Sequence, residues 1–332
     1  MESAKSPSKS NRIKHQDMSK TVEEVINEAV ATRAQQPAPA PRGFSSSSPG
    51  PFSQNSPILP DETNVTWPMP VERFRYGHFL MPGDVILTSR MESFFSFLTR
   101  TFDDSRFAHS ALTFITPHHY PAVERSYVIE ASFEGVDLNA FSEYVAPSSI
   151  YAKAKRKPRY IVGVKRLEAD WFTNAMRPMV GARMLRFIKD DNYNFSLLAE
   201  LAVGRSKLLA RLRNLIFGKS PTISDYLKKS RKYAPDEFIC SGFVQFAYVD
   251  MIRSAVEEGL LPPGKALEAH RDVLFAPWMD ANSSMEDLLA VKPLELAGTS
   301  RLQWKYLIYD GVVHKVENES QVNKIFDSVN GS

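Results

Sequence analysis

The segment Phe238-Ile239-Cys240-Ser241-Gly242-Phe243-Val244 decides the fold and the chemistry of this chain. It follows the turn residues Pro235-Asp236-Glu237, and its apolar residues continue at helical spacing, so we expect a helix over 240–256. A thiol at the first residue of a helix lies beside unpaired backbone N–H groups and the positive end of the helix dipole, which favour the reactive thiolate. A free cysteine is also commonly a small buried hydrophobic residue, and this segment alone leaves both interpretations open.

Short strands are expected upstream of this helix and a hairpin downstream of it. Asp310-Gly311 is typical of a two-residue type I′ turn. Strands and helices do not alternate regularly, which favours an α+β fold with an antiparallel sheet packed against helices. The expected elements are strands at 85–87, 111–115, 127–131 and 160–164, a helix at 171–188, and a hairpin of 304–309 with 312–316.

The composition is that of a globular protein with one polar, low-complexity end. The chain has 332 residues, 43% of them hydrophobic, and a net charge of +3, which does not indicate a nucleic-acid partner. Its single cysteine excludes an internal disulfide and a cysteine-cluster metal site, and we expect neither a metal nor a cofactor. Residues 1–72 are rich in proline and serine and predict a disordered tail, in which 21–33 has the spacing of a short docking helix or a frayed one.

The apolar runs of the sequence bear on where the protein is located in the cell. None is long enough to cross a membrane, and the N-terminal region has no apolar stretch of the signal-peptide type. We therefore expect a cytoplasmic protein, with export by a specialised secretion system left open.

A thiolate nucleophile needs a base and a group that orients the base. Of seven histidines, His109 is the candidate, because it follows the polar loop 103–106 and directly precedes an expected strand, where the sheet would hold it at a cleft edge. A surface or capping histidine is the alternative. Glu130 stands inside the apolar run 128–131, so its carboxylate either orients a partner or points to solvent by strand alternation.

Six short motifs occur in a distinctive order: Gly83-Asp84-Val85-Ile86-Leu87, Ala108-His109-Ser110-Ala111-Leu112, Val128-Ile129-Glu130-Ala131-Ser132, Gly135-Val136, Tyr193-Asn194-Phe195 and Cys240-Ser241-Gly242-Phe243-Val244. Over about residues 80 to 315 they resemble the circularly permuted branch of the NlpC-type, papain-like superfamily, the YiiX/YaeF-like amidases. In unpermuted relatives the cysteine precedes the histidine. The order histidine, glutamate, cysteine is instead similar to the permuted group, which includes acyltransferases similar to lecithin:retinol acyltransferase.

The resemblance implies a permuted papain-like catalytic domain over 73–318, followed by a C-terminal tail at 319–332. It also implies a mechanism, in which Cys240 attacks an acyl or amide carbon to form a thioester, His109 moves the proton and Glu130 orients His109. Tyr193 would line the cleft or donate to the oxyanion. The expected function is a cysteine hydrolase of amidase or peptidase type, with a lipid-directed acyltransferase or a thioesterase as the alternative.

The segment 203–232 departs from the family pattern because it is long and strongly basic. It carries nine lysines and arginines against one acid, Asp225, and Leu208, Leu212 and Leu215 form an apolar face beside them. This pattern is typical of an interfacial helix that binds an anionic membrane surface. A lid or a surface helix with a solvated basic face is the alternative. A non-enzymatic module that binds a membrane or a partner through 203–232 is therefore a second alternative function.

Overall fold

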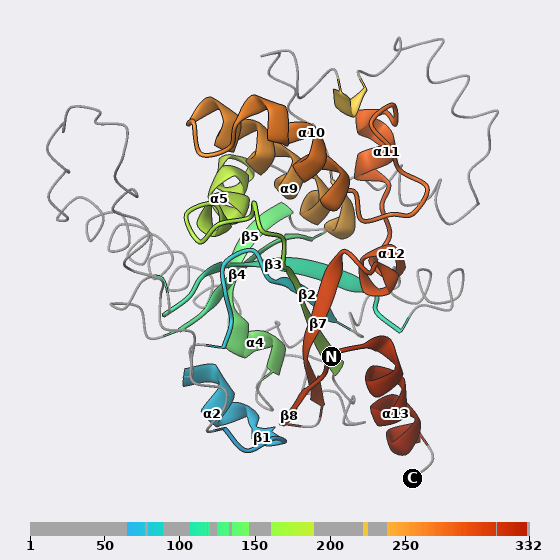
Figure 1. Ribbon diagram of the computed structural model, residues 1–332. Coiled ribbons are helices and arrows are strands. Elements are labelled where there is room, and N and C mark those ends of the chain that lie inside the picture. Colours follow the sequence, from blue (N-terminus) through green and yellow to red (C-terminus); the bar gives the residue numbers. More distant parts are fainter. Residues whose placement is uncertain are drawn as a thin grey trace, which may run out of the picture.

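The structure, a computed structural model, describes residues 65–76, 79–88, 106–117, 119, 125–132, 135–145, 161–188, 222–224, 238–309 and 311–330. Its centre is an open sheet of eight strands in the order β1-β8-β7-β6-β2-β3-β4-β5, and every neighbouring pair is antiparallel (Figure 1). Helices pack against this sheet. The predicted α+β class with an antiparallel sheet is thereby confirmed.

All four strands expected upstream of the cysteine helix are present, and the terminal hairpin pairs Tyr309 with Val312 around Gly311, whose φ is +79°. Two further strands, β1 and β5, were not predicted. The strands are β1 (Met69–Pro70), β2 (Val85–Thr88), β3 (His109–Ile115), β4 (Tyr127–Ser132), β5 (Gly135–Ala140), β6 (Ile161–Leu167), β7 (Leu302–Tyr309) and β8 (Val312–Lys315).

The expected helix at 240–256 is confirmed as α9, but the expected helix at 171–188 is wrong over its first third, and its last part is a 3₁₀ helix. Residues 170–176 form turns, and the helix begins only at Arg177. Pro178 explains the difference, because proline fits the first turn of a helix and not its interior. The helices are α2 (Val71–Tyr76), α4 (Phe141–Val145), α5 (Arg177–Ala182), the 3₁₀ helix η4 (Arg183–Phe187), α9 (Cys240–Glu257), α10 (Pro263–Asp272), α11 (Met285–Leu289), α12 (Pro293–Gly298) and α13 (Glu319–Asn330).

The sheet separates two hydrophobic clusters. On one face α9 packs on β3 and β4 and is surrounded by α5, η4, α10, α11 and α12, whereas α2 and α4 cover the other face (Figure 1). Every residue of α9 from Cys240 to Ala255 is buried, as expected for a helix enclosed on all sides. The start of α9 is therefore held rigidly against the sheet.

The folded part extends beyond the boundaries expected from the sequence at both ends. Met69 and Pro70 pair with β8, and α2 follows directly. At the other end, Val322 and Phe326 lie on one face of α13 and are buried, and the Phe326 ring contacts Phe107. The predicted docking helix at 21–33 lies outside the described residues, as does the segment 203–232 except for 222–224. Within the described ranges, no helix has the length and apolar character needed to cross a membrane.

Candidate active site

Cys240 is the first residue of α9, as predicted, and its side chain is buried against the sheet. The preceding Ile239 is extended, with φ −98° and ψ 158°, so the chain turns into the helix at the cysteine itself. Phe238 anchors this turn because its ring packs edge-on against Phe187 and Phe243. The apolar residues of the motif thus place the thiol at the positive end of an 18-residue helix.

His109 and Glu130 meet across β3 and β4. The register that pairs Leu112 with Ile129 brings the start of β3 beside the end of β4. The His109 imidazole, through Nε2, and Oε2 of Glu130 share a hydrogen bond, and both side chains are largely buried. Of the two interpretations of Glu130, the structure therefore favours the one in which its carboxylate orients a partner.

Cys240 shares a side-chain hydrogen bond with His109. Because Nε2 of His109 is engaged by Glu130, Nδ1 is the nitrogen that remains for the thiol. The three residues expected to act together, Cys240, His109 and Glu130, are thus brought into one hydrogen-bonded chain.

The charges of this cluster favour a thiolate–imidazolium pair. Burial alone would lower the pKa of His109, but the neighbouring charges of Glu130 and Cys240 outweigh it and raise that pKa to about 10. Burial alone would raise the pKa of the Cys240 thiol, but the His109 charge and hydrogen bonds from His109 and Ser110 bring it below its ordinary value. Both shifts move the proton from sulfur to the imidazole.

Glu130 is held in its ionised form by several partners. Burial would raise its pKa, but the charge of His109 and hydrogen bonds from His109, Tyr144 and Asn139 lower it. Asn139 donates from Nδ2 to Oε1 at 2.7 Å, while Oε2 is the oxygen bonded to His109. The negative charge also acts on Glu143 nearby, whose pKa is raised by burial and by Glu130.

Three residues that contribute to the site were given no role from the sequence: Ser110, which occurs in a quoted motif, and Asn139 and Tyr144. Asn139 lies on β5, and the alternation of Val136, Leu138 and the polar residues between them is a period-two signal for this strand that was overlooked. Ser110 directly follows the histidine, and its backbone N–H donates to the Cys240 sulfur and helps to lower the thiol pKa. Tyr193, expected to line the cleft or donate to the oxyanion, lies outside the described residues.

The Gly83-Asp84 motif has a structural explanation that does not involve the thiol. Arg166 donates from Nε and Nη2 to the two carboxylate oxygens of Asp84 at 2.7 and 2.8 Å, and the Met81 amide donates to the same carboxylate at 2.9 Å. Gly83 has φ +81°, and its carbonyl accepts a hydrogen bond from the Tyr248 hydroxyl of α9. This motif therefore ties the start of β2 to β6 and to the helix that carries Cys240.

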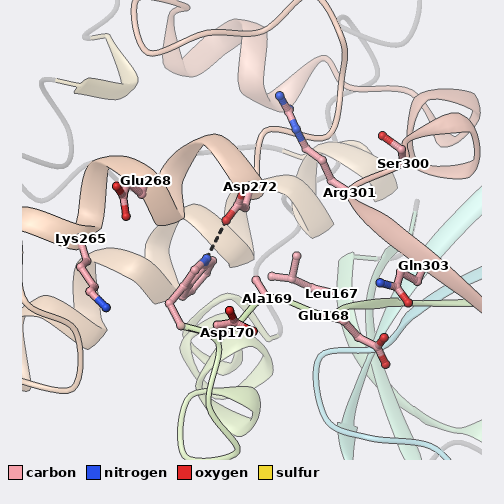
Figure 2. A pocket seen from close by; sticks show the side chains of 11 residues that line it. Leu167, Glu168, Ala169, Asp170, Lys265, Glu268, Asp272, Ser300, Arg301 and Gln303 are labelled. Carbon is pink, nitrogen blue, oxygen red and sulfur yellow. Dashed lines mark hydrogen bonds between the residues drawn. The ribbon is translucent and has the colours of Figure 1, made fainter.

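A pocket of about 540 Å³ lies elsewhere in the molecule (Figure 2). Thr88 of β2 pairs with His109 on one side and with Val162 of β6 on the other, so Val162 marks the level of the thiol site on β6. Leu167, which lines the pocket, lies five residues further along β6 than Val162, a distance of about 17 Å at the rise of a strand. The Trp171 indole N–H donates to Asp272 in its wall at 2.8 Å (Figure 2). The pocket is lined by Leu167, Glu168, Ala169, Asp170, Trp171, Lys265, Glu268, Asp272, Ser300, Arg301 and Gln303 and is separate from the thiol site.

In the described part of the chain, no group of three or more histidine, cysteine, aspartate or glutamate side chains is arranged to hold a metal ion.

No protein-family model matches the chain, and a search of curated proteins finds no match either. The protein is defined by its own features, an α+β fold with a Cys-His-Glu cluster at the N-terminus of a buried helix.

Proposed function

We propose that the protein is a cysteine hydrolase of amidase or peptidase type, which works through a thioester on Cys240. The observation that carries the proposal is the hydrogen-bonded chain from Cys240 through His109 to Glu130. The order of these residues and the antiparallel sheet behind them are the reasons to assign the domain to the circularly permuted papain-like type.

The chemistry begins from the thiolate–imidazolium pair. The Cys240 sulfur adds to the carbonyl carbon of an amide, and the backbone N–H of Cys240 at the start of α9 is placed to donate to the resulting oxyanion. The imidazolium of His109 gives its proton to the leaving amine as the C–N bond breaks, which leaves a thioester and a neutral imidazole. His109 then takes a proton from water, the hydroxide adds to the thioester, and the carboxylic acid leaves as the thiolate is restored.

Glu130 has two tasks in this sequence. Its bond to Nε2 turns the ring so that Nδ1 faces the thiol, and its negative charge stabilises the imidazolium in each cycle. Asn139 holds the second carboxylate oxygen and so limits rotation of Glu130.

An activated ester, p-nitrophenyl acetate, tests the proposal without knowledge of the natural substrate. We expect a burst of one nitrophenolate per chain and a mass gain of one acetyl group on Cys240. His109→Ala should slow the burst about a hundredfold or more, the scale of general-base catalysis. His314→Ala removes a half-buried histidine of β8 and should leave the burst unchanged. Acetylation of Cys240 at the same rate in both variants and the wild type would contradict the proposal.

A further inference from the structure

One buried carboxylate in the middle of α9 faces three arginines. Asp250 is fully buried, and its Oδ2 lies 3.3 Å from Nε of Arg183 and 3.2 Å from Nη2 of Arg186. Its Oδ1 lies 3.0 Å from Nη2 of Arg253. We call Arg183, Arg186 and Arg253 the arginine cluster.

Two members of the arginine cluster, Arg183 and Arg186, together carry two positive charges against one carboxylate among the described residues. Arg253 has a second acid nearby, since Glu257 lies 3.8 Å from its Nε. Arg183 and Arg186 share one oxygen of Asp250, which among the described residues is their one ion-pair partner. Their side chains are 33% and 35% exposed, so the excess charge lies on two guanidinium groups that a ligand can reach from solvent.

The two accessible guanidinium groups are also held in place. Arg183 and Arg186 are three residues apart in the 3₁₀ helix η4, where such positions lie one above the other. The Arg186 guanidinium lies 4.8 Å from the ring centre of Phe187 and 5.9 Å from that of Phe246. Because Asp250 holds both side chains and the two rings also hold Arg186, a ligand that binds them loses little conformational entropy.

We propose that the arginine cluster is a binding site for a phosphate group, supplied either by a soluble phosphate compound or by the headgroup of an anionic lipid. Guanidinium groups bind phosphate oxygens through paired N–H donors, and two adjacent ones match the charge of the ligand. Asp250 lies ten residues beyond Cys240 in α9, about 15 Å along the helix axis, so this site is distinct from the thiol site.

Calorimetric titration of the full chain with inorganic phosphate, at an ionic strength held constant with sodium chloride, tests the site. Arg183→Gln and Arg186→Gln should each weaken phosphate binding about tenfold, as expected when one charge-assisted hydrogen-bonding group is lost. Arg183→Lys retains the charge beside Asp250 but loses the planar fork, so it should fold like the wild type and still bind phosphate more weakly. Arg73→Gln, at an exposed position of α2 on the other face of the sheet, is the matched control and should bind normally.

Sedimentation with vesicles distinguishes the two sources of phosphate. Stronger binding to phosphatidylglycerol vesicles than to phosphatidylcholine vesicles, reduced in Arg183→Lys, assigns the site to a lipid headgroup. Phosphate binding without this vesicle preference assigns it to a soluble phosphate compound. Equal behaviour of Arg183→Lys and the wild type in both assays overturns the proposal, and so does a wild type that binds inorganic phosphate no better than chloride. Cys240→Ala should bind phosphate normally, so failure of this site and failure of the thiol site are separable.

Discussion

Gly242, two residues after the nucleophile, occupies a position where any side chain should destabilise the protein. A Cβ atom at this position would lie 2.0 Å from the carbonyl oxygen of Leu289, and 2.7 and 2.8 Å from the carbonyl carbon and Cα of the same residue. Cβ atoms essentially never approach other atoms closer than 3.0 Å, so α9 and the end of α11 must separate by about 1 Å. All three contacts are with backbone, and a rotamer change of Leu289 cannot relieve them.

The magnitude of the effect follows from two opposing contributions. Alanine in place of glycine inside a helix stabilises by roughly 0.5–1 kcal/mol, while overpacking of a dense core costs about 1–3 kcal/mol or more. With a backbone overlap of this size we expect Gly242→Ala to lower the free energy of unfolding by about 2 kcal/mol. The same displacement would move the Cys240 thiol relative to His109, so alkylation of the thiol should slow as well.

Gly264 provides the matched control. It lies in α10, and a Cβ atom there would have no atom within 4 Å among its described surroundings. Gly264→Ala should therefore stabilise the protein by roughly 0.5–1 kcal/mol, the opposite sign. Urea denaturation monitored by circular dichroism measures both changes. A Gly242→Ala variant as stable as the wild type would refute the close approach of α9 and α11 on which this prediction depends.

Three further predictions concern buried polar groups. Asn139→Leu removes the 2.7 Å hydrogen bond to Glu130, and we expect the pH profile of Cys240 alkylation to move upward while the melting temperature changes little; an unchanged profile would exclude a positioning role. His270 is buried, neither ring nitrogen has a partner among the described residues, and burial together with Arg271 and Arg301 lowers its pKa to about 4. The imidazole of His270 takes up a proton near pH 6.5 in the unfolded chain, but in the folded protein it does so only near pH 4. The free energy of unfolding should therefore fall by about 3 kcal/mol between pH 6.5 and pH 4. In urea denaturation, His270→Phe should flatten this pH dependence. The ammonium group of Lys165 donates to the carbonyls of Leu296, Ala297 and Thr299 at the end of α12. Lys165→Met should therefore lower the free energy of unfolding by about 3 kcal/mol. A loss below about 1 kcal/mol would show that water replaces the ammonium group.

The parts of the fold that were predicted from sequence are those with a strong local signal. The turn-forming residue types at 235–237 and the apolar spacing that follows predict the start of α9 at Cys240, and the apolar run after His109 predicts β3. The helix at 171–188 was extended too far because its apolar spacing begins before Pro178, the residue that sets the true start.

The contacts of the site depend on pairings between strands, which local patterns do not determine. Glu130 reaches His109 only because β3 and β4 pair in one register, which shifts between Thr113 and Ile115. Asn139 reaches Glu130 through the pairing of β4 with β5, a strand that the sequence analysis did not include. A one-residue slip in the pairing of β3 with β4, or of β4 with β5, would turn the side chain of Glu130 or of Asn139 to the other face of the sheet. The sequence thus identifies candidate residues, and the sheet decides which of them meet.

The account depends most directly on the protonation state of Cys240. Its thiol pKa is measured by the rate of iodoacetamide alkylation as a function of pH, and intact mass reports the site because the chain has one cysteine. We predict a wild-type pKa well below the ordinary value of about 8.5, with His109→Ala returning it to that value or above and Glu130→Gln giving an intermediate result. A wild-type pKa at or above about 8.5 that is unchanged in His109→Ala would contradict the thiolate–imidazolium pair, and with it the proposed hydrolase.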